Sequence, residues 1–199
     1  HRLLCSAALR QAGVQLRLDS WLASFQDDGR AVTLGTTSGK QIEGDALVGA
    51  DGVWSRVRQQ LLNDGPPRFT GHLAYRTMLR QALLPEALRT NQVTAWLGPR
   101  LHVVQYPVRG GEAMNVVAIV HGQPPADAET WDHSANADDL AHATHGLCTP
   151  LCNLLAAVPG ASVNDHAWRL WALADREPVQ GAHQMARGCV ALLGDAAHP

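Results

Sequence analysis

Two short, entirely apolar runs, each followed at once by an aspartate and a glycine, constrain the fold of this chain more than any other feature. The first run is Ala46–Ala50, which ends at Asp51-Gly52, and the second is Cys189–Leu193, which ends at Gly194-Asp195. A continuous apolar run of this length is typical of a strand that is buried on both faces, as in a parallel sheet. The sequence therefore predicts an α/β fold whose two buried strands lie far apart in the chain.

The segment between these runs has a different pattern. The turn-rich stretch Asn63–Pro67 marks a domain boundary, and the runs beyond it are separated by glycine and proline turns, as in an antiparallel sheet. We expect strands at His72–Arg80, Gln92–Leu97, Leu101–Pro107, Ala113–Val120 and His166–Leu173, and helices at Ala137–His145 and Leu147–Ala157. Before the boundary, Asp27-Asp28-Gly29 predicts a hairpin between Trp21–Gln26 and Ala31–Thr36.

These patterns predict three stretches. Residues 1–65 form the first part of the α/β domain, residues 66–180 form an inserted antiparallel-sheet domain, and residues 181–199 return to the α/β domain. The fold class is α/β with an α+β insert.

Composition favours small-molecule chemistry. A net charge of -2 and an isoelectric point near 6.6 do not indicate the excess of positive charge that nucleic-acid-binding proteins carry. No apolar run approaches the length of a membrane span and no export signal opens the chain, so we expect a cytoplasmic protein that binds no membrane. The four cysteines and ten histidines are scattered, so we expect reduced thiols and no metal. A homo-oligomer is compatible with the sequence.

The run that ends at Gly194-Asp195 continues as small residues up to Pro199. The end of a strand with a helix start behind it offers free N–H groups to a phosphate, and Asp195 can accept hydrogen bonds from sugar hydroxyls. A plain turn in which Asp195 caps the helix explains the same residues equally well.

The run that ends at Asp51-Gly52 leads into a helical pattern with two arginines. Gly52 permits close approach of the backbone to a ligand, and Arg56 or Arg58 could neutralise a phosphate. From the residues alone, an ordinary turn before a solvated helix face is the better interpretation.

A third group of candidates lies in the expected sheet. Because side chains alternate along a strand, His102 and Tyr106 point to one face and can line one surface. From the residues alone, a structural histidine beside a core tyrosine is the better interpretation. Tyr75 and Arg76 are neighbours in the chain, so only one of them can point to a given face of the sheet.

The two aspartate–glycine segments, in this order and with a sheet insert between them, resemble the DG and GD motifs of the flavoprotein aromatic hydroxylases, in particular the salicylate hydroxylase and 3-hydroxybenzoate 6-hydroxylase branch. Further similar stretches cover nearly the whole chain: HRLLCSAAL at its start, GHLAYR at Gly71–Arg76, YPVRGG at Tyr106–Gly111 and WALADREPV at Trp171–Val179. The resemblance implies part of an FAD-binding, Rossmann-like domain that carries an inserted substrate domain, as in para-hydroxybenzoate hydroxylase.

The resemblance also implies FAD as cofactor and NAD(P)H as electron donor. It places these residues at the cofactor: Arg2, Asp51, Gly52, Arg58, Gly194, Asp195, His198 and Pro199. Trp54 departs from the motif, which often has a polar residue there, and this puts the nicotinamide role of the segment in doubt. Asp175-Arg176 matches a family stretch, although adjacent opposite charges are typical of a solvated turn.

For the reaction, the resemblance implies a monooxygenase that uses O2 to hydroxylate a phenolic or aromatic acid through a flavin C4a-hydroperoxide. His102 and Tyr106 would touch the substrate, His102 taking a proton from its phenol, and Tyr75 or Arg76 would complete the site, with Arg76 pairing a carboxylate. Two alternatives stay open: a flavoenzyme of the same fold that performs epoxidation or halogenation, and a non-catalytic remnant.

The two ends predict an internal fragment. The chain opens on His1 directly before a helical pattern and stops at Pro199 just after a buried strand. The family's Gly-x-Gly-x-x-Gly turn, which grips the FAD pyrophosphate, would precede His1. We therefore expect this chain alone to be inactive and to retain FAD weakly.

Overall fold

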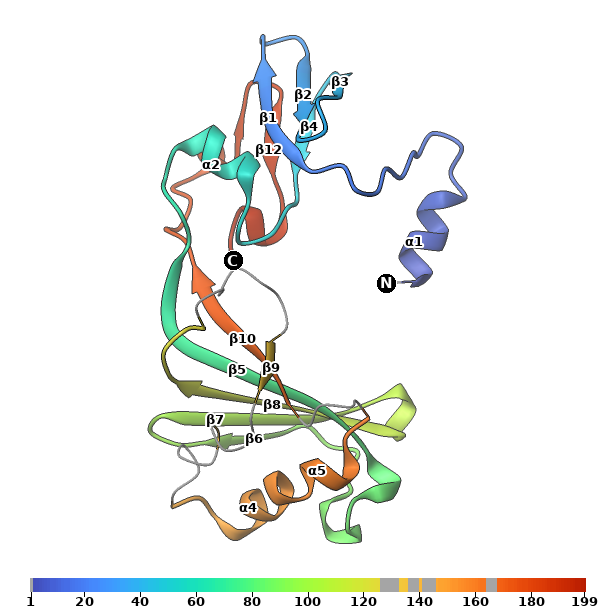
Figure 1. The fold of residues 1–199 in the computed structure, drawn as a ribbon, viewed down its shortest axis with the longest axis vertical. Coiled ribbons are helices and arrows are strands. Elements are labelled where there is room, and N and C mark those ends of the chain that lie inside the picture. Colours follow the sequence, from blue (N-terminus) through green and yellow to red (C-terminus); the bar gives the residue numbers. More distant parts are fainter. Residues whose placement is uncertain (1, 126–132, 136–139, 141–145, 164–167) are drawn as a thin grey trace. The chain divides into compact units, whose positions relative to one another are not determined.

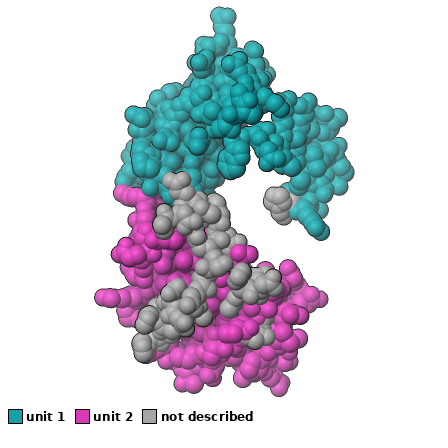
Figure 2. Space-filling model, viewed as in Figure 1, with its two compact units in different colours: residues 1–67, 176–199 teal, residues 68–175 magenta. Residues whose placement is uncertain are grey.

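The computed structural model describes residues 2–125, 133–135, 140, 146–163 and 168–199. The chain divides into two compact units (Figure 2): unit 1 comprises His1–Pro67 and Arg176–Pro199, and unit 2 comprises Arg68–Asp175. The assignment of residues 1–65 and 181–199 to one domain and of residues 66–180 to an inserted domain stays a prediction. In the described part of the chain, no helix has both the length and the apolar character needed to cross a membrane.

Unit 1 holds two small sheets. One is antiparallel, in the order β1-β2-β3, and the other has the order β11-β12-β4, with β12 parallel to β4 (Figure 1). Its elements are α1 (Arg2–Leu9), β1 (Leu22–Asp27), β2 (Val32–Thr36), β3 (Gln41–Gly44), β4 (Leu47–Gly49), α2 (Arg56–Leu62), α6 (Ala182–Met185), β11 (Ala186–Arg187), β12 (Val190–Leu192) and the 3-10 turn η5 (Gly194–Ala196). The expected hairpin is confirmed, since β1 pairs with β2 across a turn in which the Asp28 carboxylate accepts two main-chain N–H groups.

A compact apolar cluster holds unit 1 together. Helix α2 packs against β1 and β12, and it ends at Asn63, whose φ of 52° is the left-handed conformation common after helices. The buried members of the cluster are Phe25, Val32, Val57, Leu61, Val190, Leu192, Ala196 and Ala197. Helix α1 lies outside it and buries none of its residues.

Unit 2 is built on one six-stranded sheet in the order β6-β7-β8-β5-β10-β9, in which every neighbouring pair is antiparallel. Its elements are β5 (Arg68–Arg80), β6 (Thr94–Leu97), β7 (Leu101–Val108), β8 (Ala113–His121), β9 (His133–Ala135), β10 (Trp168–Asp175), α4 (Thr149–Ala156), α5 (Val158–Ala161) and the 3-10 turns η1 (Gln81–Leu83), η2 (Glu86–Leu88) and η3 (Arg109–Gly111). The antiparallel sheet expected from the sequence is confirmed. The helix expected at Ala137–His145 lies outside the described residues, apart from Leu140.

The two faces of this sheet differ. Helices α4 and α5 lie along one of them, where Leu151, Leu154 and Val158 join the largest apolar core of the chain (Figure 1). This helix-covered face includes Leu73, Tyr75, Leu101 and Val103, which are buried. The opposite side, called the His102 face below, carries the alternate residues: Ala74, Arg76, Met78, His102, Val104, Tyr106, Asn115, Val117 and Ile119.

Candidate functional site

The two strands that precede the aspartate–glycine segments are neighbours in one sheet. In the parallel pair, Leu47 lies opposite Val190 and Gly49 opposite Leu192. The main-chain N–H of Leu193 continues the pairing with a hydrogen bond of 2.8 Å to the Gly49 carbonyl. Because parallel strands end at the same edge of a sheet, Asp51-Gly52 and Gly194-Asp195 leave that edge together, which agrees with the resemblance that places both segments at one cofactor.

Asp51 organises the first of these turns. Its carboxylate accepts hydrogen bonds from the Ser55 hydroxyl at 2.6 Å and from the main-chain N–H groups of Arg56 at 2.9 Å and Val57 at 3.2 Å. Three donors at the start of α2 therefore hold both carboxylate oxygens. Gly52 has a φ of 78°, and a Cβ at this position would meet nothing within 4 Å, so the turn leaves its backbone open.

Arg58 ties α2 to the second turn. Its side chain is almost fully buried, with 1% exposed. The guanidinium donates to Asp64 at 2.7 Å, to the carbonyls of Ala197 at 2.9 Å and Ala196 at 3.4 Å, and to the Glu177 carbonyl. A direct contact with a phosphate would require these bonds to break, so Arg58 supports the edge from inside unit 1.

Arg176 corrects one expectation from the sequence. It is 7% exposed, and so it does not belong to a solvated turn, whereas its neighbour Asp175 is half-buried and pairs with Arg68 at 2.7 Å. The Arg176 guanidinium binds the carbonyls of Val53, Ser55 and Gly65 and the carboxylate of Asp64. Burial is the largest cause that lowers the pKa of Arg176, and the Asp64 charge opposes it. Since an arginine in a protein stays protonated, Asp64 lies between two cations.

The turn that follows β12 contains two buried alanines between exposed residues. Gly194 adopts a φ of 60°, and the carbonyl of Gly194 accepts the N–H groups of Ala197 and His198. Ala196 and Ala197 are fully buried. Asp195, His198 and Pro199 are exposed, and the Asp195 carboxylate makes no hydrogen bond or ion pair with the described residues. This carboxylate is therefore available to a ligand.

Arg2, another predicted cofactor residue, lies on helix α1, which buries none of its residues against the rest of unit 1. It is exposed on α1, and its side chain bonds to none of the residues that the structure describes. Its approach to a flavin stays a prediction.

In unit 2, His102 and Tyr106 lie on one face, as alternation predicted. Along β7, Leu101, Val103 and Gln105 are buried, and the residues between them are half-buried. His102 pairs with Ile119 of β8, and Tyr106 pairs with Asn115. The catalytic roles of His102 and Tyr106 stay predictions.

Of the neighbours Tyr75 and Arg76, only Arg76 lies on the His102 face. Tyr75 is 3% exposed in the core of the helix-covered face, where its ring meets Trp168 edge-on at 6.5 Å between centroids. A substrate on the His102 face therefore cannot touch Tyr75. Arg76 is exposed, and its Nε donates to the Asn115 side-chain oxygen at 2.8 Å.

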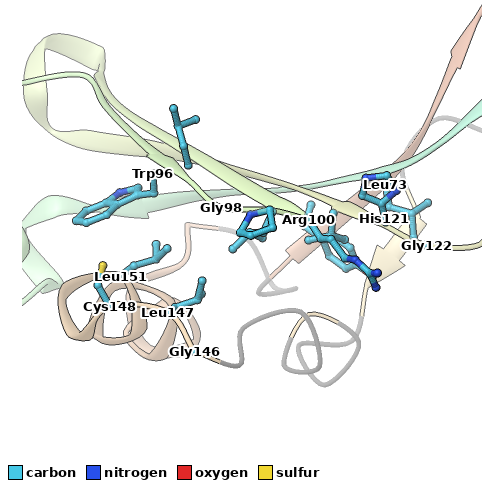
Figure 3. A pocket seen from close by; sticks show the side chains of 15 residues that line it. Leu73, Trp96, Gly98, Arg100, His121, Gly122, Gly146, Leu147, Cys148 and Leu151 are labelled. Carbon is cyan, nitrogen blue, oxygen red and sulfur yellow. The ribbon is translucent and has the colours of Figure 1, made fainter.

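A cavity of about 750 Å³ lies on the other side of the sheet (Figure 3). Tyr75 and Leu101 line it from the strands, and Cys148 and Leu151 line it from the start of α4. These four residues belong to the helix-covered side, and neither His102 nor Tyr106 lines the cavity.

The sequence did not single out four residues that shape these surfaces: Ser55, Asp64, Arg176 as a buried group, and Asn115. Ser55 could have been found as a helix cap three residues before Arg58. Asp64 lies in the turn-rich boundary segment, and no sequence pattern reveals that two arginines from different segments converge on it.

A model of the family described as "FAD binding domain" matches residues 1–199, and the chain belongs to this family. It is 36% identical over 200 residues to 3-hydroxybenzoate 6-hydroxylase of Polaromonas naphthalenivorans, covering 100% of this chain and 46% of the relative. It is 35% identical over 199 residues to 3-hydroxybenzoate 6-hydroxylase 2 of Aquipseudomonas alcaligenes, covering 100% of this chain and 58% of the relative.

The fold of this chain is also similar to solved structures of flavoproteins. A salicylate hydroxylase substrate complex superposes with a TM-score of 0.80 at 28% identity, covering 99% of this chain and 50% of that one. Klebsiella pneumoniae HpxO, complexed with FAD and uric acid, gives a TM-score of 0.68 at 28% identity, covering 90% and 43%. The expected family and fold class are therefore confirmed, and the chain spans about half the length of the relatives it matches.

Proposed function

We propose that the whole protein, of which this chain is a part, is an FAD-dependent, NAD(P)H-consuming monooxygenase that hydroxylates a phenolic or aromatic acid. The observation that carries the proposal is the parallel pairing of β4 with β12, which brings the two aspartate–glycine turns to one edge. Relatives named 3-hydroxybenzoate 6-hydroxylase and a salicylate hydroxylase neighbour support this substrate class.

The edge fits a flavin nucleotide. Gly52 and Gly194, both at positive φ, leave backbone uncovered, and the exposed Asp195 carboxylate can accept hydrogen bonds from ribityl or ribose hydroxyls. His198 and Pro199 are exposed beyond the two buried alanines that follow Asp195, and Gly52 lies on the neighbouring turn. We assign Asp195, Gly194 and Gly52 to direct contacts, and Asp51 and Arg58 to holding the two turns in place. When bound, FAD would accept electrons from NAD(P)H and use O2 to supply one oxygen atom to the substrate ring.

His102 serves as the base in this proposal. A neutral imidazole nitrogen accepts the proton of the substrate phenol, and the resulting phenolate ring is richer in electrons and reacts more readily with an electrophilic oxygen. Tyr106 lies four residues further along the same side of β7, so its hydroxyl, which can donate or accept, orients the substrate's polar group.

The test uses the full-length protein purified with FAD. NAD(P)H oxidation is followed with and without 3-hydroxybenzoate or salicylate, and the products are analysed by mass. We expect faster NAD(P)H oxidation and a product heavier by one oxygen atom. An FAD-loaded protein that no phenolic acid stimulates would contradict the proposal, and an epoxide or a halogenated product would assign the same fold to a different reaction.

A further inference from the structure

The His102 face holds a pair of arginines that the proposed chemistry does not yet use. Arg76 of β5 lies directly opposite Arg169 of β10, and residues that face each other across antiparallel strands point to the same side. On its other side Arg76 pairs with Val117, which in turn pairs with Val104. One row across four strands therefore runs from Val104 to two neighbouring cations.

Arg76 is held in a defined orientation. Its Nε donates to the side-chain oxygen of Asn115 at 2.8 Å, and its two terminal amino groups have no acceptor among the described residues. Arg76 is exposed, while Asn115 is only 1% exposed. The guanidinium is thus fixed at its base and available at its tip, which is the geometry that binds a carboxylate through two parallel hydrogen bonds.

One unfavourable feature of this region would be relieved by an anion. The side-chain nitrogen of Asn115 is buried and lacks a hydrogen-bond partner among the described residues, which costs free energy. An anionic group bound at the tip of Arg76 would bring an acceptor close to this nitrogen.

The position of the pair relative to His102 suggests what carries the anion. His102 lies on β7 and Arg76 on β5, two strands away, so their backbones are about 10 Å apart across the sheet. An imidazole and a guanidinium that lean toward each other over this distance leave room for one benzene ring. A substrate with a phenol at one end and a carboxylate at the other fits between them.

We infer that Arg76 binds the carboxylate of the aromatic substrate, and that Asn115 is a positioning residue that acts through Arg76. The inference rests on the proposed function, and it makes the carboxylate the group that selects the substrate. The phosphates of NAD(P)H are the other anions that Arg76 could bind.

The test measures binding to the full-length, FAD-loaded protein by calorimetry, with 3-hydroxybenzoate and its neutral analogue 3-hydroxybenzamide. We expect Arg76→Met to weaken binding of the acid roughly tenfold to a hundredfold, the value of one or two charged hydrogen bonds, and to leave the amide nearly unchanged. Arg76→Lys keeps the charge without the fork, so its loss should be intermediate. Arg80→Met, an exposed arginine of the same strand, is the matched control and should bind both compounds like the wild type.

Asn115→Leu should weaken binding of the acid less than Arg76→Met does, and should add little when Arg76 is already Met, since both act through one group. Equal losses for acid and amide, or an unchanged affinity for the acid, would overturn the inference. So would a loss that appears in the KM for NAD(P)H and not for the acid, because the anion would then be a phosphate. Binding is read without turnover: a wild type that binds the acid through Arg76 but does not hydroxylate it contradicts the proposed function alone.

Discussion

Arg58 and Arg176 carry two charges into unit 1, and Asp64 lies between them. Arg58 also holds the carbonyls of Ala196 and Ala197 beneath the second turn. We expect Arg58→Met to lower the free energy of unfolding by about 3 kcal/mol, because it removes one partner of a buried ionic network and leaves carbonyls unpaired. Urea unfolding of the full-length protein measures this loss.

The matched control is Arg56→Met, two residues earlier on the same helix, where the arginine is exposed. Its effect should stay within about 0.5 kcal/mol, as for most surface changes. FAD content should also fall in Arg58→Met, because the carbonyls beneath the second turn lose their donor. Equal effects of the two variants would show that the buried network does not support the edge.

The role proposed for His102 also depends on a single side chain, because its imidazole accepts one proton. We expect His102→Gln to lower kcat with a phenolic acid roughly a hundredfold or more, which is the usual contribution of a general base. Raising the pH should restore part of the rate, because the substrate phenol then ionises without help. His121→Gln, an exposed histidine at the end of β8, serves as control and should keep the wild-type rate. A pH-independent loss in His102→Gln would assign His102 a structural role.

At the scale of elements, Gly49 sets how closely β4 and α2 pack. A Cβ at this position would come within 2.6 Å of the Val57 Cβ, closer than real side chains approach each other. We expect Gly49→Ala to destabilise the protein by about 1 to 3 kcal/mol through overpacking. The nearest clashing atom is the Val57 Cβ, which only a change to glycine removes. Adding Val57→Gly should therefore recover part of the loss, so that the two changes are not additive.

Gly44→Ala provides the comparison, since a Cβ there meets its nearest atom at 3.8 Å. Its unfolding midpoint in urea should move much less. If the loss caused by Gly49→Ala were the same with Val57→Gly as with Val57, the contact between β4 and α2 would not be what requires a glycine.

The sequence predicted elements better than the partners of single side chains. Alternation placed His102 and Tyr106 on one face of β7, and the two apolar runs indicated buried strands, because both signals come from the chain's local period. The burial of Arg176 and the choice between Tyr75 and Arg76 depend on which face the helices cover. That is a matter of tertiary packing, which a local pattern does not contain.

At the scale of the whole molecule, the chain leaves and re-enters unit 1 through adjacent strands of unit 2. Arg68 at the start of β5 lies opposite Asp175 at the end of β10, and the two side chains form an ion pair of 2.7 Å. The two ends of the insert therefore emerge side by side. This explains how β4 and β12 can pair although more than one hundred residues separate them in sequence.

This pairing makes a prediction for hydrogen exchange. If one flavin rests on both turns, removing FAD from the full-length protein should raise the exchange of main-chain amides in residues 50–58 and in residues 193–198 together, because each segment supports the other through Arg58. Strand β8, at the centre of the unit 2 sheet, should keep its protection in both states. Mass spectrometry of the exchanged protein resolves these segments, and a response confined to one of the two turns would mean that the flavin does not rest on both.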